Sequence, residues 1–186
     1  LLDLIIKQKK EENFYLPIDI NLEKSISKVL IESNYIGIAP GAGEKNKIWH
    51  KENFIEICNY IRSLNLNLVF FIGPDEINLK DIFKNLFPNS IFIEDEIKGY
   101  SNLEIVMAST KFLKLAISND SGVSHMLSTG HCPLLKLFGP KDPKKFTPNK
   151  KNLYSISSNE FNSSNINEIP ANRVIKEITK ILENSN

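Results

Sequence analysis

Short apolar runs alternate along the chain with segments in which apolar residues recur every three or four positions. The runs are typical of strands buried on both faces, and the recurring pattern is typical of amphipathic helices. The expected strands cover residues 35–39, 66–72, 90–93, 112–117, 133–138 and 153–157. The expected helices cover residues 22–33, 51–64, 77–86, 101–109, 122–130 and 170–184. Alternating strands and helices predict an α/β fold with a parallel sheet of about six strands and helices on both faces.

The beginning of the chain has no clear period. Residues 7–13 form a run of charged and amide side chains, and Pro17 interrupts the segment after it. We therefore expect residues 1–34 to be a linker and a first helix, and residues 35–186 to form the domain.

Composition narrows the class of protein. The chain has 186 residues, of which 41% are hydrophobic and 24% charged, as in a globular domain. Its net charge of +1 does not indicate general nucleic-acid binding. Cys58 and Cys132 have no metal-site spacing and are expected to be free thiols. No apolar run approaches the roughly 18 residues of a membrane span, and the first six residues are too few for a signal peptide.

The loops after the expected strands hold most of the chemically interesting polar residues. Ligands of parallel α/β sheets bind outside the carboxyl ends of the strands. A binding site is therefore expected among the loops at residues 40–49, 73–76, 94–101, 118–122 and 139–147.

The stretch 117–125 is the most informative of these loops, because a strand is expected to give way there to a polar turn and a helix. Ser121 is a good helix N-cap, and Gly122 lets a ligand approach the backbone closely. Asp120 adds an acceptor and His125 a possible cation. The set suits a ligand with hydroxyls and phosphates. The plainer alternatives are a packed His125 and an Asp120 that only stabilises the helix N-terminus.

The loop from Gly41 to Lys47 resembles a phosphate-binding loop only superficially. It has neither the Walker spacing nor G-x-G-x-x-G. Lys47 is either a phosphate ligand or an ordinary surface lysine, and Trp49 is interpreted as a packing anchor. Without a G-x-S-x-G elbow, Ser121 and His125 do not indicate a hydrolase.

Together these fragments resemble glycosyltransferase family 9, whose best-known members are the ADP-heptose:lipopolysaccharide heptosyltransferases. The resemblance covers about residues 35–150 in the family's order and spacing. Two positions depart from the pattern: His50 replaces a proline, and Lys136 puts a charge inside a strand. The matching fragments are Ala39-Pro40-Gly41-Ala42, Lys47-x-Trp49, Phe71-Ile72-Gly73, Asn119-Asp120-Ser121-Gly122-x-x-His125 and Leu137-Phe138-Gly139-Pro140.

The resemblance implies a role for each matching residue. Asp120 would accept hydrogen bonds from sugar hydroxyls, and Ser121 and Gly122 would donate backbone N–H groups to the diphosphate. Lys47 and His125 would stabilise charge on the departing diphosphate. The other donor-binding residues would be Gly41, Ala42, Asp75 and Glu76, with the two carboxylates near the nucleoside. We expect Asp120→Ala to abolish donor binding and leave the fold intact.

The resemblance also implies a function for the whole. The family has the GT-B architecture of two Rossmann-like domains, and this chain resembles the C-terminal, donor-binding one. We expect it to bind a nucleotide-diphosphate sugar, such as ADP-heptose, without a metal or other cofactor. It would be inactive without an N-terminal domain that supplies the base and binds a lipopolysaccharide-type glycan acceptor. The expected location is cytoplasmic, including the inner face of the bacterial inner membrane with peripheral association.

Two alternatives remain open at this point. The chain is compatible with a stand-alone or degenerate nucleotide-sugar-binding module without catalysis. It is also compatible with the donor domain of another GT-B enzyme that uses a UDP-sugar.

Overall fold

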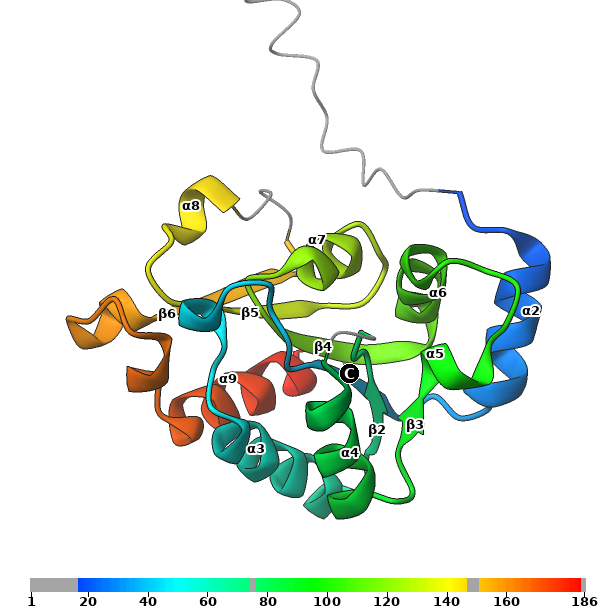
Figure 1. Cartoon of the computed structure of the whole chain (residues 1–186), viewed down its shortest axis with the longest axis horizontal. Coiled ribbons are helices and arrows are strands. Elements are labelled where there is room, and N and C mark those ends of the chain that lie inside the picture. The colour runs from blue at the N-terminus through cyan, green and yellow to red at the C-terminus, as the bar shows by residue number, and fades with distance from the viewer. Residues whose placement is uncertain (1–16, 74–75, 147–150, 185–186) are drawn as a thin grey trace, which may run out of the picture.

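A six-stranded parallel sheet forms the centre of the protein in the computed structural model, which describes residues 17–73, 76–146 and 151–184 (Figure 1). The strand order is β3-β2-β1-β4-β5-β6, and every neighbouring pair is parallel. The expected α/β fold is therefore confirmed. The strands are β1 (Tyr35–Ala39), β2 (Asn67–Phe70), β3 (Ile91–Phe92), β4 (Leu113–Asn119), β5 (Leu134–Phe138) and β6 (Leu153–Ser157).

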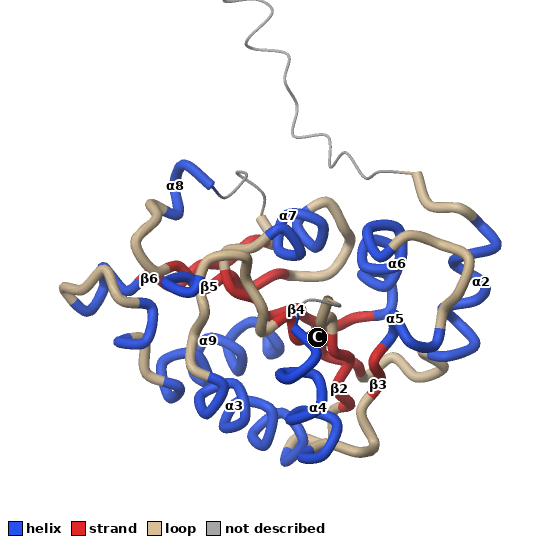
Figure 2. The backbone as a smooth tube through the Cα atoms, in the orientation of Figure 1, coloured by secondary structure: helices blue, strands red, loops and turns tan. Residues whose placement is uncertain are grey.

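Helices cover both faces of the sheet, as Figure 2 shows by colour. One face packs against α3 (Lys51–Ser63), α4 (Ile77–Leu86) and α9 (Ala171–Glu183). The other packs against α2 (Ile20–Val29), α5 (Ile93–Glu96), α6 (Asn102–Ser109) and α7 (Gly122–Ser128). Shorter helical turns are α8 (Pro143–Phe146), η1 (Lys45–Lys47), η3 (Thr110–Phe112), η4 (Ser158–Phe161) and η5 (Ile166–Glu168).

The two cores result from the alternation of side chains along each strand. In β1, Ile36 and Ile38 point to the α3 face, whereas Tyr35 and Ala39 point to the α2 face. Every residue of β1 is buried, as expected for a central parallel strand.

Several predicted boundaries were wrong, each for a local reason. The first helix is α2, which begins at Ile20 because Asp19 caps it, accepting from the N–H groups of Asn21 and Leu22. It ends at Val29, so residues 30–33 are not helical. The third strand is only β3, because Ile93 already begins α5. The segments predicted as loops at 40–49 and 139–147 contain the turns η1 and α8.

The expected linker at the chain's beginning falls largely in residues 1–16, outside the described residues. The first helix, however, is part of the domain core. Leu22, Ile26 and Leu30 are each at most 2% exposed and pack with the buried side chains of α6. The packing therefore has no break at residue 34.

The order of the strands identifies the carboxyl ends of two central strands as the expected ligand site. Chain connectivity reverses direction between β1 and β4, which lie side by side. The loops that leave their carboxyl ends diverge to opposite faces, and such a switch point is where ligands bind in open α/β sheets. Within the described part of the chain, no helix has the length and apolar content needed to cross a membrane.

Candidate functional site

Two adjoining cavities lie at the carboxyl ends of β1 and β4. They share Gly43, Ser121 and Gly122. The first, which we call the polar cavity, has a volume of about 280 Å³ and is lined by Gly43, Glu44, Lys47, Asp120, Ser121, Gly122, His125 and Lys141. The second, the apolar cavity, has about 540 Å³ and is lined by Ala39, Gly41, Ala42, Gly43, Ile48, Phe71, Gly73, Glu76, Ser121, Gly122, Val123 and Met126.

The structure brings the candidate residues together at these cavities. Those expected at the sugar and diphosphate line the polar cavity: Lys47, Asp120, Ser121, Gly122 and His125. Gly41, Ala42 and Glu76 line the apolar cavity. Asp75 lies outside the described residues.

Helix α7 begins as the sequence predicts, with Ser121 as its N-cap. The Ser121 hydroxyl accepts from the N–H of Ser124 at 3.3 Å, and the N–H of Ser121 donates to the Ser124 hydroxyl at 3.1 Å. The N–H of Ser121, expected to donate to a diphosphate, is thus already bonded inside this capping box. The N–H of Gly122 opens the helix and has no acceptor within it, so it is the better placed of the two donors.

The loop after β1 is held in place by the end of β4. The Asn119 side chain donates to the carbonyl of Pro40 at 2.7 Å and accepts from the N–H of Trp49 at 3.3 Å. Trp49 is fully buried, donates its indole N–H to the carbonyl of Ile169 at 2.8 Å and packs edge-on against Phe54. Trp49 is therefore the packing anchor that the sequence predicted, and Asn119 fixes both ends of the loop that carries Lys47.

Lys47 reaches the polar cavity from this loop. Its side chain is 17% exposed and forms an ion pair with Glu44 at 2.5 Å. The ammonium group of Lys47 keeps the pKa of Glu44 below its usual value. A ligand phosphate would compete with Glu44 for the same ammonium group.

His125 lies on α7 at the rim of the polar cavity. Partial burial lowers its pKa below the usual value, and the positive charges of Lys136 and Lys47 lower it further, against an opposing effect of Asp120. The imidazole is therefore neutral at neutral pH in this ligand-free arrangement. The possible cation at this position stays a prediction for the ligand-bound protein.

Asp120 is paired with a second buried charge. The Nζ atom of Lys136 lies 3.2 Å from Oδ1 of Asp120, and the two side chains are 0% and 6% exposed. The contact is an ion pair without the alignment of a hydrogen bond, because Oδ1 has no aligned donor among the described residues. Asp120→Ala would leave a buried lysine without its carboxylate. We therefore expect this change to destabilise the fold, contrary to the prediction from the sequence.

Two glycines shape the cavities in different ways. A Cβ atom on Gly41 would overlap the carboxylate of Glu76, so the absence of a side chain lets Glu76 lie against this loop. A Cβ atom on Gly122 would meet nothing within 4 Å and would project into open space at the cavities. That space is the close approach to the backbone that the sequence predicted for a ligand.

Comparison with known proteins identifies the family. The model of glycosyltransferase family 9 (heptosyltransferase) matches residues 5–173. This chain belongs to glycosyltransferase family 9. The match extends beyond the 35–150 region in which the motifs were recognised.

Family 9 relatives match in sequence and in fold. The lipopolysaccharide core heptosyltransferase OpsX of Haemophilus influenzae is 27% identical over 121 residues, covering 64% of this chain and 35% of that protein. A family 9 glycosyl transferase structure from Veillonella parvula has a TM-score of 0.77 at 19% identity, covering 98% of this chain and 57% of that one. The E. coli heptosyltransferase WaaC with ADP has a TM-score of 0.66 at 19% identity, covering 80% and 44%.

The matched structures share the fold, and the matched proteins are longer than this chain. The structural identities are low and show a shared fold, which agrees with the doubly covered parallel sheet described above. The chain spans about a third of the length of the curated family 9 relatives it matches.

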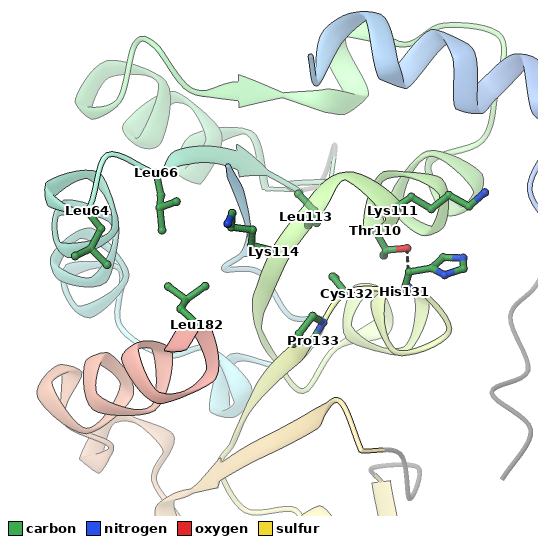
Figure 3. A pocket seen from close by; sticks show the side chains of 10 residues that line it. All are labelled: Leu64, Leu66, Thr110, Lys111, Leu113, Lys114, His131, Cys132, Pro133 and Leu182. Atoms are coloured by element: carbon green, nitrogen blue, oxygen red, sulfur yellow. Dashed lines mark hydrogen bonds between the residues drawn. The ribbon is translucent and has the colours of Figure 1, made fainter. Parts of the chain in front are cut away.

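A separate cavity of about 450 Å³ lies at the opposite, amino edge of the sheet (Figure 3). Leucines from β4, from α9 and from the segment between α3 and β2 form much of its wall. His131 approaches from the segment before β5 and donates its backbone N–H to the Thr110 hydroxyl at 3.2 Å. None of the residues predicted for donor binding lines it. For a family 9 chain, the carboxyl edge therefore remains the candidate donor site.

The described residues contain no cluster of three or more His, Cys, Asp or Glu side chains that would hold a metal ion. The expectation that donor binding needs no metal stays a prediction.

Sequence reasoning missed part of the site. Lys141 and Glu44 line the polar cavity, but neither was among the residues predicted for the site. Lys136 was noticed as a charge inside an apolar strand, but its partner depends on the strand pairing of β4 with β5. Asn119 directly precedes Asp120 in a recognised motif, and this position could have marked it as part of the site. Its two bonding partners could not be predicted, because they lie 70 and 79 positions away in the sequence.

Proposed function

We propose that this chain binds the nucleotide-diphosphate sugar donor of a glycosyl transfer reaction, with ADP-heptose as donor and a lipopolysaccharide-type glycan as acceptor. The convergence of family 9 motif residues from separate loops on two adjoining cavities at the sheet's switch point carries this proposal. The names of the matched heptosyltransferases support the choice of sugar and acceptor.

The two cavities suit the two halves of such a donor. The apolar cavity would take the nucleoside, and the Glu76 carboxylate that lines it would accept from the ribose hydroxyls. The polar cavity would take the diphosphate and the sugar. Lys47 and the N–H of Gly122 would contact phosphate oxygens, and Asp120 would accept from sugar hydroxyls.

Transfer would be a direct displacement at the anomeric carbon. The acceptor hydroxyl oxygen forms the new bond to that carbon as the bond to the diphosphate oxygen breaks, and the electron pair leaves with the nucleoside diphosphate. Lys47 and the Gly122 N–H would stabilise the developing charge on that oxygen. The carboxylates that line the polar cavity, Glu44 and Asp120, are both paired with lysines, so we assign the acceptor's base to neither.

The reaction would transfer the sugar of the nucleotide sugar to a lipid-linked glycan and release the nucleoside diphosphate. We propose the cytoplasmic face of the inner membrane as its location. In this proposal the described residues of this chain bind the donor. We assign to them neither acceptor binding nor the base that takes the hydroxyl proton.

Calorimetric titration with ADP and UDP tests the proposal. We expect ADP to bind in preference to UDP, and Lys47→Ala to weaken ADP binding by about tenfold, because one charge-assisted phosphate contact is lost. Lys111→Ala is the matched control, because Lys111 forms a similar Lys–Glu ion pair, with Glu23 at 2.6 Å, away from both cavities. Preference for UDP would replace the donor with a UDP-sugar. Absence of binding by the folded chain would refute donor binding by this chain alone.

A further inference from the structure

Strand β5 carries a lysine at a position where its neighbours are apolar. Lys136 lies between Leu135 and Leu137, and its side chain is fully buried. It stands opposite Ser118 of β4 and Ser155 of β6, in the interior of the sheet. A buried ammonium group is unfavourable unless it is compensated, so its surroundings should reveal what the charge does.

The Lys136 ammonium group contacts an acidic and an aromatic side chain. Nζ lies 3.2 Å from Oδ1 of Asp120 and 4.9 Å from the centre of the Phe138 ring, which adds a cation–π contact. Asp120 is among the described residues that line the polar cavity, and Lys136 is not. The lysine therefore acts on that cavity through the carboxylate.

The charges around the polar cavity show why this pairing matters. Lys47 comes from η1, Lys141 from the loop after β5, His125 from α7, and Glu44 from the loop after β1. Lys136, which lies behind Asp120, offsets the carboxylate charge that an anionic ligand in this cavity would otherwise meet.

We propose that Lys136 is the counter-ion of Asp120, fixing this carboxylate as an acceptor for sugar hydroxyls while cancelling its repulsion of the neighbouring diphosphate. This inference rests on the proposed donor-binding function. It makes Lys136 a positioning residue, which acts on the donor through Asp120.

A cycle of three variants separates this role from a general structural one. Lys136→Met removes the charge at similar volume, Asp120→Asn removes the carboxylate charge, and the double variant is a neutral pair of similar shape. We expect Lys136→Met to weaken ADP binding by about tenfold, because an uncompensated carboxylate then faces the diphosphate. The double variant should restore ADP affinity to within about twofold of the original protein. Asp120→Asn completes the cycle, and its Tm should fall, because Lys136 is then buried without its carboxylate.

The pH dependence gives the signature of an unpaired carboxylate. In Lys136→Met the loss of ADP affinity should be larger at about pH 8 than at about pH 6, because a buried carboxylate without its cation takes up a proton more readily as the pH falls. Lys136 also contributes to the lowered pKa of His125, so every protein of the series, the original included, is compared in a His125→Gln background at each pH.

Unfolding without ligand tests the pair independently of the donor. In Lys136→Met the folded state binds the proton of Asp120 more tightly than the unfolded state does, so stability should fall as the pH rises. The loss of Tm relative to the original protein should therefore be greater at about pH 8 than at about pH 5, and the double variant should show no such trend.

The outcomes distinguish this inference from the proposed function. Failure of the original protein to bind ADP or UDP refutes the function, and the unfolding series then decides on the ion pair. A folded Lys136→Met that binds ADP within about twofold of the original at both pH values overturns the inference. If Lys136→Met does not fold, the double variant decides. Near-original ADP affinity supports the counter-ion role, whereas a loss of about tenfold would show that Lys136 itself binds phosphate and would overturn it.

Discussion

Gly122 and Gly43 line both cavities, and at either position an added Cβ atom would meet no protein atom within 4 Å. Gly41 differs, because its missing side chain makes room for Glu76. Packing of the fold therefore does not require a glycine at position 122. At the scale of single residues, a ligand that lies against this backbone would explain it.

Gly122→Ala tests that explanation directly. The added methyl group should obstruct the diphosphate and weaken ADP binding by about tenfold or more, while stability stays equal or rises slightly, because alanine favours the helix more than glycine does. Asn102→Ala is the matched control, since Asn102 also comes directly after the serine N-cap of a capping box, in α6, away from both cavities. Titration calorimetry and thermal unfolding measure both effects. Unchanged ADP affinity in Gly122→Ala would move the diphosphate away from α7.

His125 provides a pH-dependent reporter of the bound anion. Its pKa lies below the usual value in the free protein, and a diphosphate beside it should raise that pKa, because an anion stabilises the imidazolium form. ADP binding should therefore take up protons near pH 6. Calorimetry in two buffers of different ionisation enthalpy measures the uptake, and His125→Gln should abolish it. The terminal phosphate of ADP also titrates near pH 6, so the test is the difference between the two proteins: an unchanged proton balance in His125→Gln would contradict the placement of phosphate at His125.

At the scale of elements, the site depends on how two loops are tied together. The loop after β1 carries Gly41, Lys47 and Trp49, and the indole N–H of Trp49 ties its far end to the carbonyl of Ile169. The Asn119 side chain, at the end of β4, bonds to this loop at both Pro40 and Trp49. The strand that leads into α7 thereby positions the opposite wall of the polar cavity as well.

Asn119→Ala should disrupt both the loop and the site. It would leave the carbonyl of Pro40 and the N–H of Trp49 buried without partners, which should cost about 2 to 4 kcal/mol of stability. ADP affinity should also fall, because Lys47 is no longer held toward the polar cavity. Denaturant unfolding and calorimetry measure the two losses.

The control for this variant is another asparagine that bridges two segments. Asn67 donates to Glu32 and Asn34 at the exposed start of β2, and Asn67→Ala should change stability by less than about 0.5 kcal/mol. A similarly small effect of Asn119→Ala would show that the loop is held by Trp49 packing alone.

The same element scale explains what the sequence could predict. Strands buried on both faces and helices with one apolar face leave clear patterns, so the order of the elements and the Ser121 cap were predictable. The lengths of α2 and β3 were less predictable. The cap at Asp19 sets where α2 begins, and the helical turn that starts at Ile93 sets where β3 ends. The Lys136–Asp120 pair was beyond reach, since it depends on which strands lie side by side.

At the scale of the whole molecule, the sheet separates two apolar cores, one under α3, α4 and α9 and the other under α2, α5, α6 and α7. Each core contains one buried thiol, Cys58 in the first and Cys132 in the second. Burial raises the pKa of Cys58 above its usual value and that of Cys132 to about 12. Both thiols should thus be unreactive in the folded protein and report on opening of their own core.

Because both cores share the same strands, we expect them to open together. A maleimide should label Cys58 and Cys132 at similar rates, each limited by unfolding of the whole domain. ADP at 100 times its dissociation constant should slow both reactions by about 100-fold, since it binds only the folded state. Mass spectrometry of the labelled peptides measures each rate. Cys132 lines the cavity at the amino edge, so faster labelling there that ADP does not slow would mean that this edge opens locally, without the donor site.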